Sequence, residues 1–398
     1  MVTVVGVGAD GWRGLSVAAQ VAVRSAEVLI GSARQLALVE SDATKVTWPS
    51  PMLPAIPGLL EEHAGRRVCV LASGDPMFFG VGSTLARLLG PQALTVIPHV
   101  SSVSLACARL GWPVEETEVL SLVGRPVEAL RLSVRPERRL LVLSADGTTP
   151  ARIAELLRDQ GFGPSRMTVF EELGGPGEYR RSGTALSWRP EPVGALNLVA
   201  VECRATPAAV LLPSGPGLPD SAFEHDGQLT KREVRAVTLA TLAPLPGELL
   251  WDVGAGSGSI GIEWLRTDPT RRAIAVEPVA ERAERITRNA KTLGVPGLQL
   301  VVGKAPEALA GLPTPDAIFV GGGVTGDGVL EACWSALRPG GRLVANAVTL
   351  DSEAVLAEWH GSVGGTLTRI EISRATPIGG FTGWRPMMPV TQWVVKRS

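Results

Sequence analysis

Short apolar runs separated by amphipathic stretches recur along the C-terminal part of the chain. The runs ELLWDVG, RAIAVEP, LQLVVG, DAIFVGGG and GRLVANAV each predict a buried strand, because they consist mainly of apolar residues bounded by turn residues. Residues 279–294 predict an amphipathic helix that ends at Gly294. Its apolar stripe consists of Ala283, Ile286, Ala290 and Leu293. Strands that alternate with helices predict a doubly wound sheet, whose ligand lies at the carboxyl ends of the strands.

The N-terminal part shows a similar alternation in two segments. Residues 1–110 contain the strand-like runs VTVVGVG, RVCVLAS and LTVIPHV, and residues 112–203 contain RRLLVLS and LNLVAVE. Helical stretches between these runs favour parallel sheets. The two segments together predict a bilobed α/β fold.

A stretch rich in proline and glycine separates the two parts. Within residues 204–228, Pro207, Pro213, Pro216 and Pro219 exclude a long helix. Thr230 and Glu233 then have the spacing of a capping box, which predicts the start of a helix. We therefore expect an N-terminal domain, a linker and a C-terminal domain over residues 1–205, 206–225 and 226–398.

Composition narrows the class of protein without identifying its chemistry. The chain has 398 residues, of which 45% are hydrophobic and 19% are charged, and its net charge is −1. This balance gives no support for nucleic-acid binding, and no apolar run is long enough to span a membrane. The four cysteines form no CxxC pair and the four histidines show no ligand spacing, so we expect neither a disulfide nor a metal site. These features predict a cytoplasmic protein.

The stretch WDVGAGSGSIG, residues 251–261, indicates a nucleoside-binding loop after the first C-terminal strand. From Gly256 onward it matches the G-x-G-x-x-G fingerprint of dinucleotide enzymes. It also contains Asp252 two residues before the first glycine, and a carboxylate there disfavours a pyrophosphate. An acid suits a ligand that carries an ammonium or sulfonium group.

Two further features favour S-adenosylmethionine (SAM) over a nicotinamide cofactor. Glu277 ends the second strand about 20 residues after the glycines, where an acid accepts hydrogen bonds from ribose hydroxyls. Residues 337–348 place a Pro-Gly-Gly turn before a late strand, which is familiar from SAM methyltransferases. A nicotinamide-dependent oxidoreductase and a non-catalytic nucleoside-binding regulator remain the alternatives.

Three turns in the N-terminal part also follow predicted strands. They contain Gly6 and Gly8, then Ser73-Gly74-Asp75-Pro76, then Val100-Ser101-Ser102. Each turn alone is compatible with an ordinary β-turn. Three turns at three strand ends are expected to face one cleft.

These motifs carry a resemblance to two known families. Residues 1–203 resemble the tetrapyrrole methylases, which are bilobed SAM enzymes of corrin and sirohaem biosynthesis. Residues 226–398 resemble a Rossmann-type SAM methyltransferase in the stretches LTKREVRAVTLATL, WDVGAGSGSIGIEW and APEAL. The two halves in this order resemble the fused, decarboxylating precorrin methyltransferases of cobalamin biosynthesis.

The resemblance implies two SAM sites in each chain and a corrinoid substrate, precorrin-6B. The N-terminal domain is expected to methylate C5. The C-terminal domain is expected to methylate C15 and to release the carboxyl group of the C12 acetate as carbon dioxide, giving precorrin-8x. The resemblance also implies a homo-oligomer, but it identifies no catalytic acid or base.

Cofactor and substrate contacts are also expected from these motifs. The implied cofactor contacts are Gly6, Gly8, Gly74, Asp75, Ser101, Ser102, Asp252, Gly254, Ala255, Gly256, Gly258, Glu277 and Ala305. Basic and aromatic side chains are expected to meet the carboxylates and the flat ring of the substrate. The candidates are Thr230, Lys231, Arg232, Trp384 and Arg385, with Trp393 as a further aromatic residue. A solvated helix start is the alternative for Lys231 and Arg232, and buried aromatic packing in a final hairpin is the alternative for Trp384, Arg385 and Trp393.

The chain departs from the two families at three positions. His99 follows Pro98 where the tetrapyrrole methylases usually have glycine, and Val123 stands where relatives often carry histidine. Lys304 precedes Ala305 where an acidic residue is common. These departures concern the contacts of the adenine and the substrate.

Overall fold

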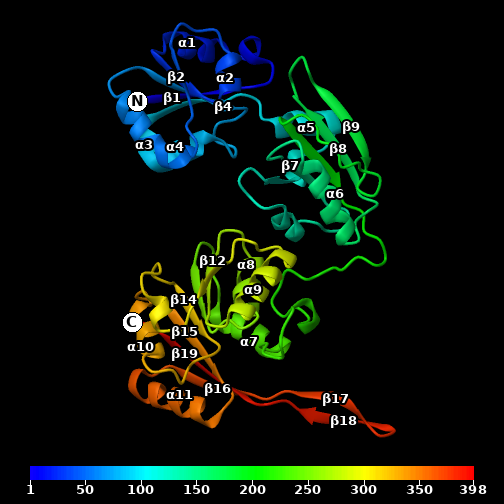
Figure 1. Ribbon diagram of the computed structural model, residues 1–398, viewed down its shortest axis with the longest axis vertical. Helices are drawn as coiled ribbons and strands as arrows, with labels where there is room; N and C mark the ends of the chain where they lie inside the picture. The colour runs from blue at the N-terminus through cyan, green and yellow to red at the C-terminus, as the bar shows by residue number, and fades with distance from the viewer. The chain divides into compact units, whose positions relative to one another are not determined.

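The computed structural model describes all 398 residues and divides the chain into two compact units. The N-terminal unit comprises Met1–Val127 and Ser133–Val210 (Figure 1). The C-terminal unit comprises Glu128–Leu132 and Leu211–Ser398. None of the helices combines the length and the apolarity that a membrane span requires.

The first lobe of the N-terminal unit is a five-stranded parallel sheet, which confirms the parallel arrangement predicted for it. The strands lie in the order β3-β2-β4-β1-β5, so the predicted strands β4, β1 and β5 are neighbours. Their carboxyl ends therefore meet at one edge. The strands are β1 (Val2–Val7), β2 (Val28–Gly31), β3 (Thr44–Thr47), β4 (Val68–Ser73) and β5 (Leu94–Ile97), and the helices are α1 (Val17–Ser25), α2 (Ala33–Ala37), α3 (Met52–Glu62) and α4 (Val81–Leu89).

The second lobe is a mainly antiparallel sheet, and the expectation of a parallel sheet there is wrong. The order is β6-β7-β10-β8-β9, in which only β6 and β7 pair in parallel. Strands β7 and β8, which α6 connects, do run in the same direction. They are not neighbours, because β10 lies between them and is antiparallel to both. The elements are α5 (Ser102–Leu110), β6 (Glu118–Ser121), β7 (Arg139–Leu143), α6 (Thr149–Asp159), β8 (Arg166–Glu171), β9 (Tyr179–Thr184) and β10 (Asn197–Glu202).

The C-terminal unit confirms the doubly wound sheet predicted from its apolar runs. Its seven strands lie in the order β13-β12-β11-β14-β15-β19-β16. The five predicted strands are parallel, and β19 pairs antiparallel with β15. The strands are β11 (Leu249–Val253), β12 (Arg272–Glu277), β13 (Gln299–Val302), β14 (Ala317–Val320), β15 (Arg342–Ala347), β16 (Thr366–Ile370) and β19 (Val390–Lys396).

Helices cover both faces of this sheet. One face carries α7 (Arg232–Leu242), α8 (Ser259–Arg266) and α9 (Ala280–Thr292), and the other carries α10 (Val329–Ala336) and α11 (Leu350–Val363) (Figure 1). The predicted stripe of α9 is buried, and Gly294 follows the helix with φ at +82°. Both predictions for this helix are therefore confirmed.

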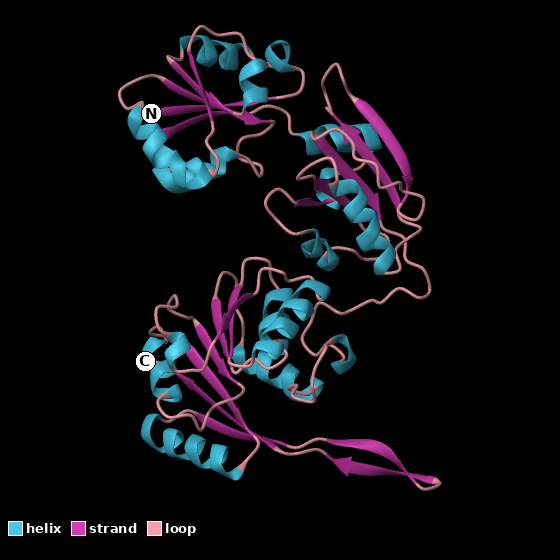
Figure 2. Cartoon of the chain, in the orientation of Figure 1, coloured by secondary structure: helices cyan, strands magenta, loops and turns pink.

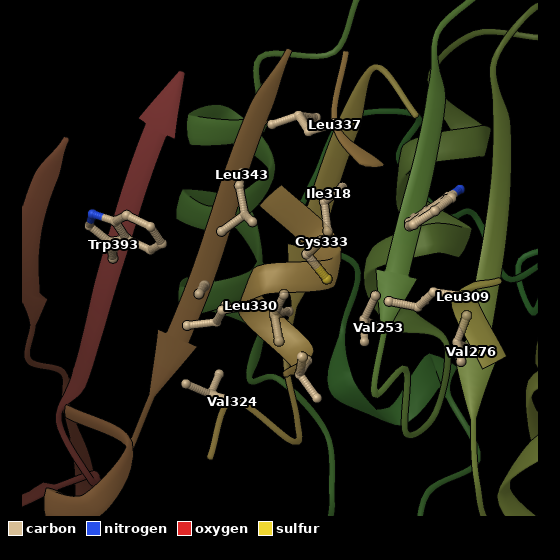
Figure 3. Packing of buried hydrophobic residues seen from close by; sticks show 14 of the residues in the cluster. Val253, Val276, Leu309, Ile318, Val324, Leu330, Cys333, Leu337, Leu343 and Trp393 are labelled. Atoms are coloured by element: carbon tan, nitrogen blue, oxygen red, sulfur yellow. The ribbon is translucent and has the colours of Figure 1, made fainter. Parts of the chain in front are cut away.

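Apolar side chains of the strands pack on α10 in the core of the second face (Figure 3). Cys333 and Leu330 of α10 lie among Val253, Ile318 and Leu343 of the central strands. Trp393 of β19 belongs to the same core and is fully buried. It therefore does not line a substrate site, and buried packing, the alternative interpretation of this residue, is what the structure shows.

The start of α7 differs from the predicted capping box. The helix begins at Arg232, and the residue at its N-cap is Lys231, whose side chain makes no capping hydrogen bond. Glu233 instead forms an ion pair with Arg374 at 2.6 Å. A tertiary ion pair thus takes the carboxylate that the sequence pattern assigns to the helix end.

The linker in the structure is shorter than the predicted one, residues 206–225. Residues 211–225 belong to the C-terminal unit, where Leu218 is fully buried and Phe223 is 4% exposed. The backbone N–H groups of Gly217 and Leu218 donate to the buried carboxylate of Glu263, at 2.6 and 2.9 Å. Arg235, which is also fully buried, holds the same carboxylate at 2.6 Å. Proline and glycine prevent a helix in this segment, but they do not prevent it from packing.

A two-stranded hairpin projects from the sheet of the C-terminal unit (Figures 1 and 2). It consists of β17 (Ser373–Ile378) and β18 (Phe381–Pro386). Phe381 and Trp384 lie on β18 with exposed fractions of 85% and 75%.

The packed segment before α7 predicts where the chain can be divided. A C-terminal fragment of residues 211–398 should be more stable than a fragment of residues 224–398. Removing Leu218 alone forfeits roughly 1.5–3 kcal/mol of apolar burial, and the buried carboxylate of Glu263 also loses two donors. Urea unfolding of the two fragments measures the difference, and equal unfolding midpoints would contradict the packing described here.

Candidate functional site

A pocket of about 590 Å³ lies at the carboxyl ends of the central strands in the C-terminal unit. Four strand ends form its floor, in the order β12, β11, β14 and β15. They contribute Glu277, the loop 254–257, the turn 321–323 and Asn346. This is the edge that the doubly wound pattern predicts for a ligand.

The glycine loop follows β11 in a left-handed conformation. Gly254, Gly256 and Gly258 have φ values of +68°, +60° and +75°, which residues with a side chain rarely adopt. A Cβ atom added to Gly254 would lie 2.5 Å from the carbonyl oxygen of Gly322. One added to Gly256 would meet only the carbonyl oxygen of Gln228, at 3.6 Å. Gly254 is therefore required for packing between two turns, whereas Gly256 borders open space in the pocket.

Glu277 fixes the middle of this loop from the neighbouring strand. Its carboxylate is 2% exposed and lines the pocket. Oε2 accepts a hydrogen bond from the N–H of Gly256 at 2.8 Å, and Oε1 accepts one from the N–H of Val279 at 3.1 Å. Since each carboxylate oxygen can accept more than one hydrogen bond, both can still accept from hydroxyl groups of a ligand.

Asp252 lies beneath the loop and does not line the pocket. Its side chain is 1% exposed, and Oδ2 accepts a hydrogen bond from the N–H of Gly261 in α8 at 2.9 Å. Its other oxygen, Oδ1, is buried without a hydrogen-bond partner. The pKa of this carboxyl is raised to about 7, chiefly by burial and to a smaller extent by the charge of Glu277, against the opposing effect of the N–H of Gly261. The expectation that Asp252 faces a cationic ligand is therefore not met.

The remaining cofactor candidates of this half divide between the pocket and its support. Ala255 and Ala305 line the pocket. Gly258 does not, and it precedes α8, where an added Cβ atom would lie 2.9 Å from the side chain of Ile286.

Only two of the five substrate candidates line the pocket. Thr230 and Lys231 contribute to its wall at the start of α7. Arg232, one residue further, is exposed and lies beside Gly217. Trp384 and Arg385 belong to the projecting hairpin and are absent from the lining. The residues that follow the hairpin, Met387 and Met388, line the pocket instead.

Several residues of the pocket were not predicted. Met387 and Met388 follow the hairpin and line the wall, together with Val390. Lys304 also lines it, at one of the positions where the chain departs from its relatives. Asn346 has a signal in the sequence, because it is the polar residue near the end of the otherwise apolar run LVANAV.

The three predicted turns of the N-terminal unit lie against one another. A Cβ atom added to Gly6 would lie 2.1 Å from the carbonyl oxygen of Gly74 and 2.6 Å from the backbone nitrogen of His99. Gly74 has φ at +59°, and its own Cβ position faces the backbone of Ser101 at 3.5 Å. The strand order β4-β1-β5 therefore brings these turns together, as expected. Their binding of a cofactor stays a prediction.

Polar side chains organise these turns. Ser101 caps α5 by accepting a hydrogen bond from the N–H of Ser104 at 3.1 Å, and Ser102 is the first residue of that helix. Asp75 accepts one from the N–H of Met77 at 2.8 Å. The ring of His99 lies beside Gly8. Its Nε2 is 3.2 Å from the carbonyl oxygen of Gly14 and 3.4 Å from the carboxylate of Asp10.

The raised pKa of Asp252 predicts a pH dependence of stability. Between about pH 4, where an unfolded aspartate ionises, and about pH 7, the folded carboxyl keeps a proton that the unfolded chain has released. The free energy of unfolding therefore falls as the pH rises through this window, and Asp252→Asn removes this contribution. The free energy of unfolding of the variant minus that of the natural chain should therefore be greater at pH 8 than at pH 5, by on the order of 1–3 kcal/mol. Urea unfolding of both proteins at both pH values measures this difference, and the same difference at the two pH values would disprove the prediction.

The open space beside Gly256 predicts a selective loss of ligand binding. Gly256→Val should abolish SAM binding in the C-terminal unit, because a branched side chain would fill the pocket and strain the loop. Gly311→Val is the matched control, since Gly311 has φ at +75°, no neighbour within 4 Å of its Cβ position and no place in the pocket lining. Both variants should lose stability, but only the first should lose binding in calorimetric titration of a fragment of residues 211–398. Equal SAM affinities in the two variants would show that the glycine loop is not part of the SAM site.

Comparison with known families matches both halves of the chain. Residues 1–186 match the family described as Tetrapyrrole (Corrin/Porphyrin) Methylases, and residues 221–397 match the Precorrin methyltransferase domain. A precorrin-6Y C(5,15)-methyltransferase (decarboxylating) of Sinorhizobium sp is 52% identical over 393 residues, which cover 98% of this chain and 95% of the relative.

Two shorter relatives each match 44% of the chain. One, named as a probable cobalt-precorrin-6B C(15)-methyltransferase (decarboxylating) of Pyrobaculum calidifontis, is 38% identical over 182 residues, 93% of its length. The other, a cobalt-precorrin-7 C(5)-methyltransferase of Salmonella typhimurium, is 30% identical over 173 residues, 85% of its length. The chain therefore belongs to the family of precorrin-6Y C(5,15)-methyltransferases (decarboxylating), with a tetrapyrrole methylase domain followed by a precorrin methyltransferase domain.

Proposed function

We propose that the chain transfers two methyl groups from SAM to precorrin-6B, at C5 and C15, and releases the carboxyl group of the C12 acetate as carbon dioxide. The observation that carries the proposal is the pocket of the C-terminal unit, in a chain of this family. Its floor joins a glycine loop and a buried acid on one side to a wall of polar and apolar groups on the other. Such a pocket has room for a nucleoside and for the edge of a second molecule.

The residues on the β11 and β12 side fit SAM, which supplies an activated methyl group on its sulfonium when it is bound. Glu277 offers free acceptor capacity for ribose hydroxyls, and the Cβ position of Gly256 is open. Ser257 lines the pocket with a buried hydroxyl that has no partner in the protein. A buried hydroxyl without a partner is costly, so a ligand that bonds to it would gain from doing so.

Lysines on the pocket wall supply positive charge for the carboxylates of the substrate. The chain has five lysines, and two of them, Lys231 and Lys304, line this pocket. Neither forms a salt bridge within the protein, although Arg282 in the same lining is paired with Asp226 at 2.8 Å. We expect the two free ammonium groups to bind carboxylates that stay on the substrate.

Catalysis of methyl transfer by these residues is mainly positional. The electron pair of the ring carbon displaces the thioether, so carbon, methyl and sulfur must lie in line. Holding two reactants in this arrangement is worth roughly 7–11 kcal/mol of barrier. Val234, Val390 and Met387 give the wall an apolar part that excludes water. No covalent nucleophile is required.

We assign C5 methylation to the N-terminal domain, with its own SAM site at the turns of Gly6, Gly74 and Ser101. C15 methylation and decarboxylation are assigned to the C-terminal domain. The names of the two shorter relatives support this division, since one acts at C(15) with decarboxylation and the other at C(5). C12 and C15 are near neighbours on the macrocycle, so one pocket can serve both reactions. Neither a nicotinamide-dependent oxidoreductase nor a non-catalytic regulator has support in this family.

Product analysis tests the proposed function and its division between domains. The full chain, given precorrin-6B and SAM with an isotopically labelled methyl group, should yield a product with two labelled methyl groups and one carbon dioxide fewer. The fragment of residues 211–398 should release carbon dioxide and add one methyl group by itself, as measured by mass spectrometry. Carbon dioxide release that requires residues 1–210 would contradict the assignment to domains, and an unmodified corrinoid from the full chain would contradict the function.

A further inference from the structure

A hydrogen-bonded cluster of polar side chains lies behind the substrate side of the C-terminal pocket. It consists of Thr238 and Thr241 of α7, Asn346 of β15 and Gln392 of β19. Thr238 is fully buried, Gln392 is 2% exposed and Asn346 is half-buried. Of the four, only Asn346 lines the pocket.

The hydroxyl of Thr238 determines how both amide groups are oriented. It donates its proton to the carbonyl oxygen of Val234, one helical turn earlier, at 2.8 Å. Its oxygen can then only accept, so the amide nitrogens of Asn346 and Gln392 must point towards it, at 3.0 and 3.1 Å.

The other hydrogen bonds of the cluster leave one amide N–H, on Asn346, without a partner. The second N–H of Gln392 donates to Oδ1 of Asn346 at 2.9 Å. The carbonyl oxygen of Gln392 lies 2.8 Å from the hydroxyl of Thr241, which shares its single proton between this oxygen and the carbonyl oxygen of Val237 at 3.0 Å. All the donors of Gln392 are thus used. The Nδ2 group of Asn346 retains one N–H, and the cluster holds this residue at the edge of the pocket.

The pocket lining around Asn346 is mainly apolar, and Lys231 lines it at the start of α7. Val234, Val348, Val390 and Met387 line the same side, whereas Glu277 and the glycine loop lie across β14 and β11. The free N–H is therefore a neutral, preoriented donor on the part of the floor that we assign to the substrate.

We propose that the free N–H of Asn346 binds the carboxylate of the C12 acetate, the one that is lost. The inference rests on the proposed function and adds a substrate-contacting residue to it. In the step itself the bond between the acetate methylene and its carboxyl carbon breaks. The electron pair passes into the conjugated ring, carbon dioxide leaves, and a proton from water later completes the methyl group.

A neutral donor suits this carboxylate better than a lysine does. The carboxylate loses its negative charge as it becomes carbon dioxide, so an ammonium partner would stabilise the starting state more than the transition state. An amide N–H also fixes the direction of the breaking bond, but it stabilises the charged carboxylate less than an ammonium group does. The apolar neighbours also disfavour a charged carboxylate, which promotes its departure.

The isosteric variant Asn346→Asp tests the proposal in the full chain. At pH 8 its carboxylate has no donor and repels the acetate, so carbon dioxide release should fall by roughly 10- to 100-fold, as expected for a lost hydrogen bond to a charged group. The apolar side chains and the facing acetate raise the pKa of the new carboxyl, so it becomes protonated and regains a donor when the pH is lowered towards 5. The rate relative to the natural chain at the same pH should therefore rise. SAM affinity and C5 methylation should stay within about twofold.

Thr238→Val separates substrate contact from support. This variant keeps its shape but removes the acceptor that orients the amide, so it should release carbon dioxide more slowly without recovery at low pH. Carbon dioxide release by Asn346→Asp that matches the natural chain at every pH would overturn the inference, as would a loss without recovery at low pH. In both cases the natural chain would still form the decarboxylated, doubly methylated product, so the proposed function would stand. Absence of that product from the natural chain would instead refute the proposed function.

Discussion

The pocket of the C-terminal unit depends on two buried carboxyl groups that hold the glycine loop and the helix that follows it. Asp252, at the end of β11, binds the N–H of Gly261 in the first turn of α8, and Glu277, at the end of β12, binds the N–H of Gly256. The left-handed glycines allow the loop to turn, and the two acids fix where it turns. With the loop held from below and from one side, its remaining face is open to a ligand.

The same sheet also determines what lies beside that ligand. Since β14 and β15 continue the floor from the glycine loop, a methyl donor over β11 faces whatever occupies the end of β15. Asn346 lies there, oriented by a cluster that joins α7 and β19. The donor and acceptor sides are therefore held by one rigid framework, as in-line transfer requires.

The sequence pattern predicts what depends on local periodicity, and it misses what depends on distant partners. The strands of the C-terminal sheet and the place of Glu277 follow from alternation and spacing. The capping box fails because Arg374, far along the chain, takes the carboxylate of Glu233. The packed segment before α7 and the order of the second lobe likewise depend on tertiary pairing. Asn346 is visible only as a polar interruption in an apolar strand, and its orientation depends on residues in two other elements.

We propose that each unit holds its own SAM site, built on a separate set of glycine turns. Calorimetric titration of SAM into the full chain, in the presence and absence of the corrinoid, counts these sites. We predict that about two SAM molecules bind to each natural chain and one to each Gly256→Val chain. If the corrinoid orders one of the sites, these numbers are reached only in its presence. A stoichiometry of one in the natural chain that persists with the corrinoid present would contradict the account.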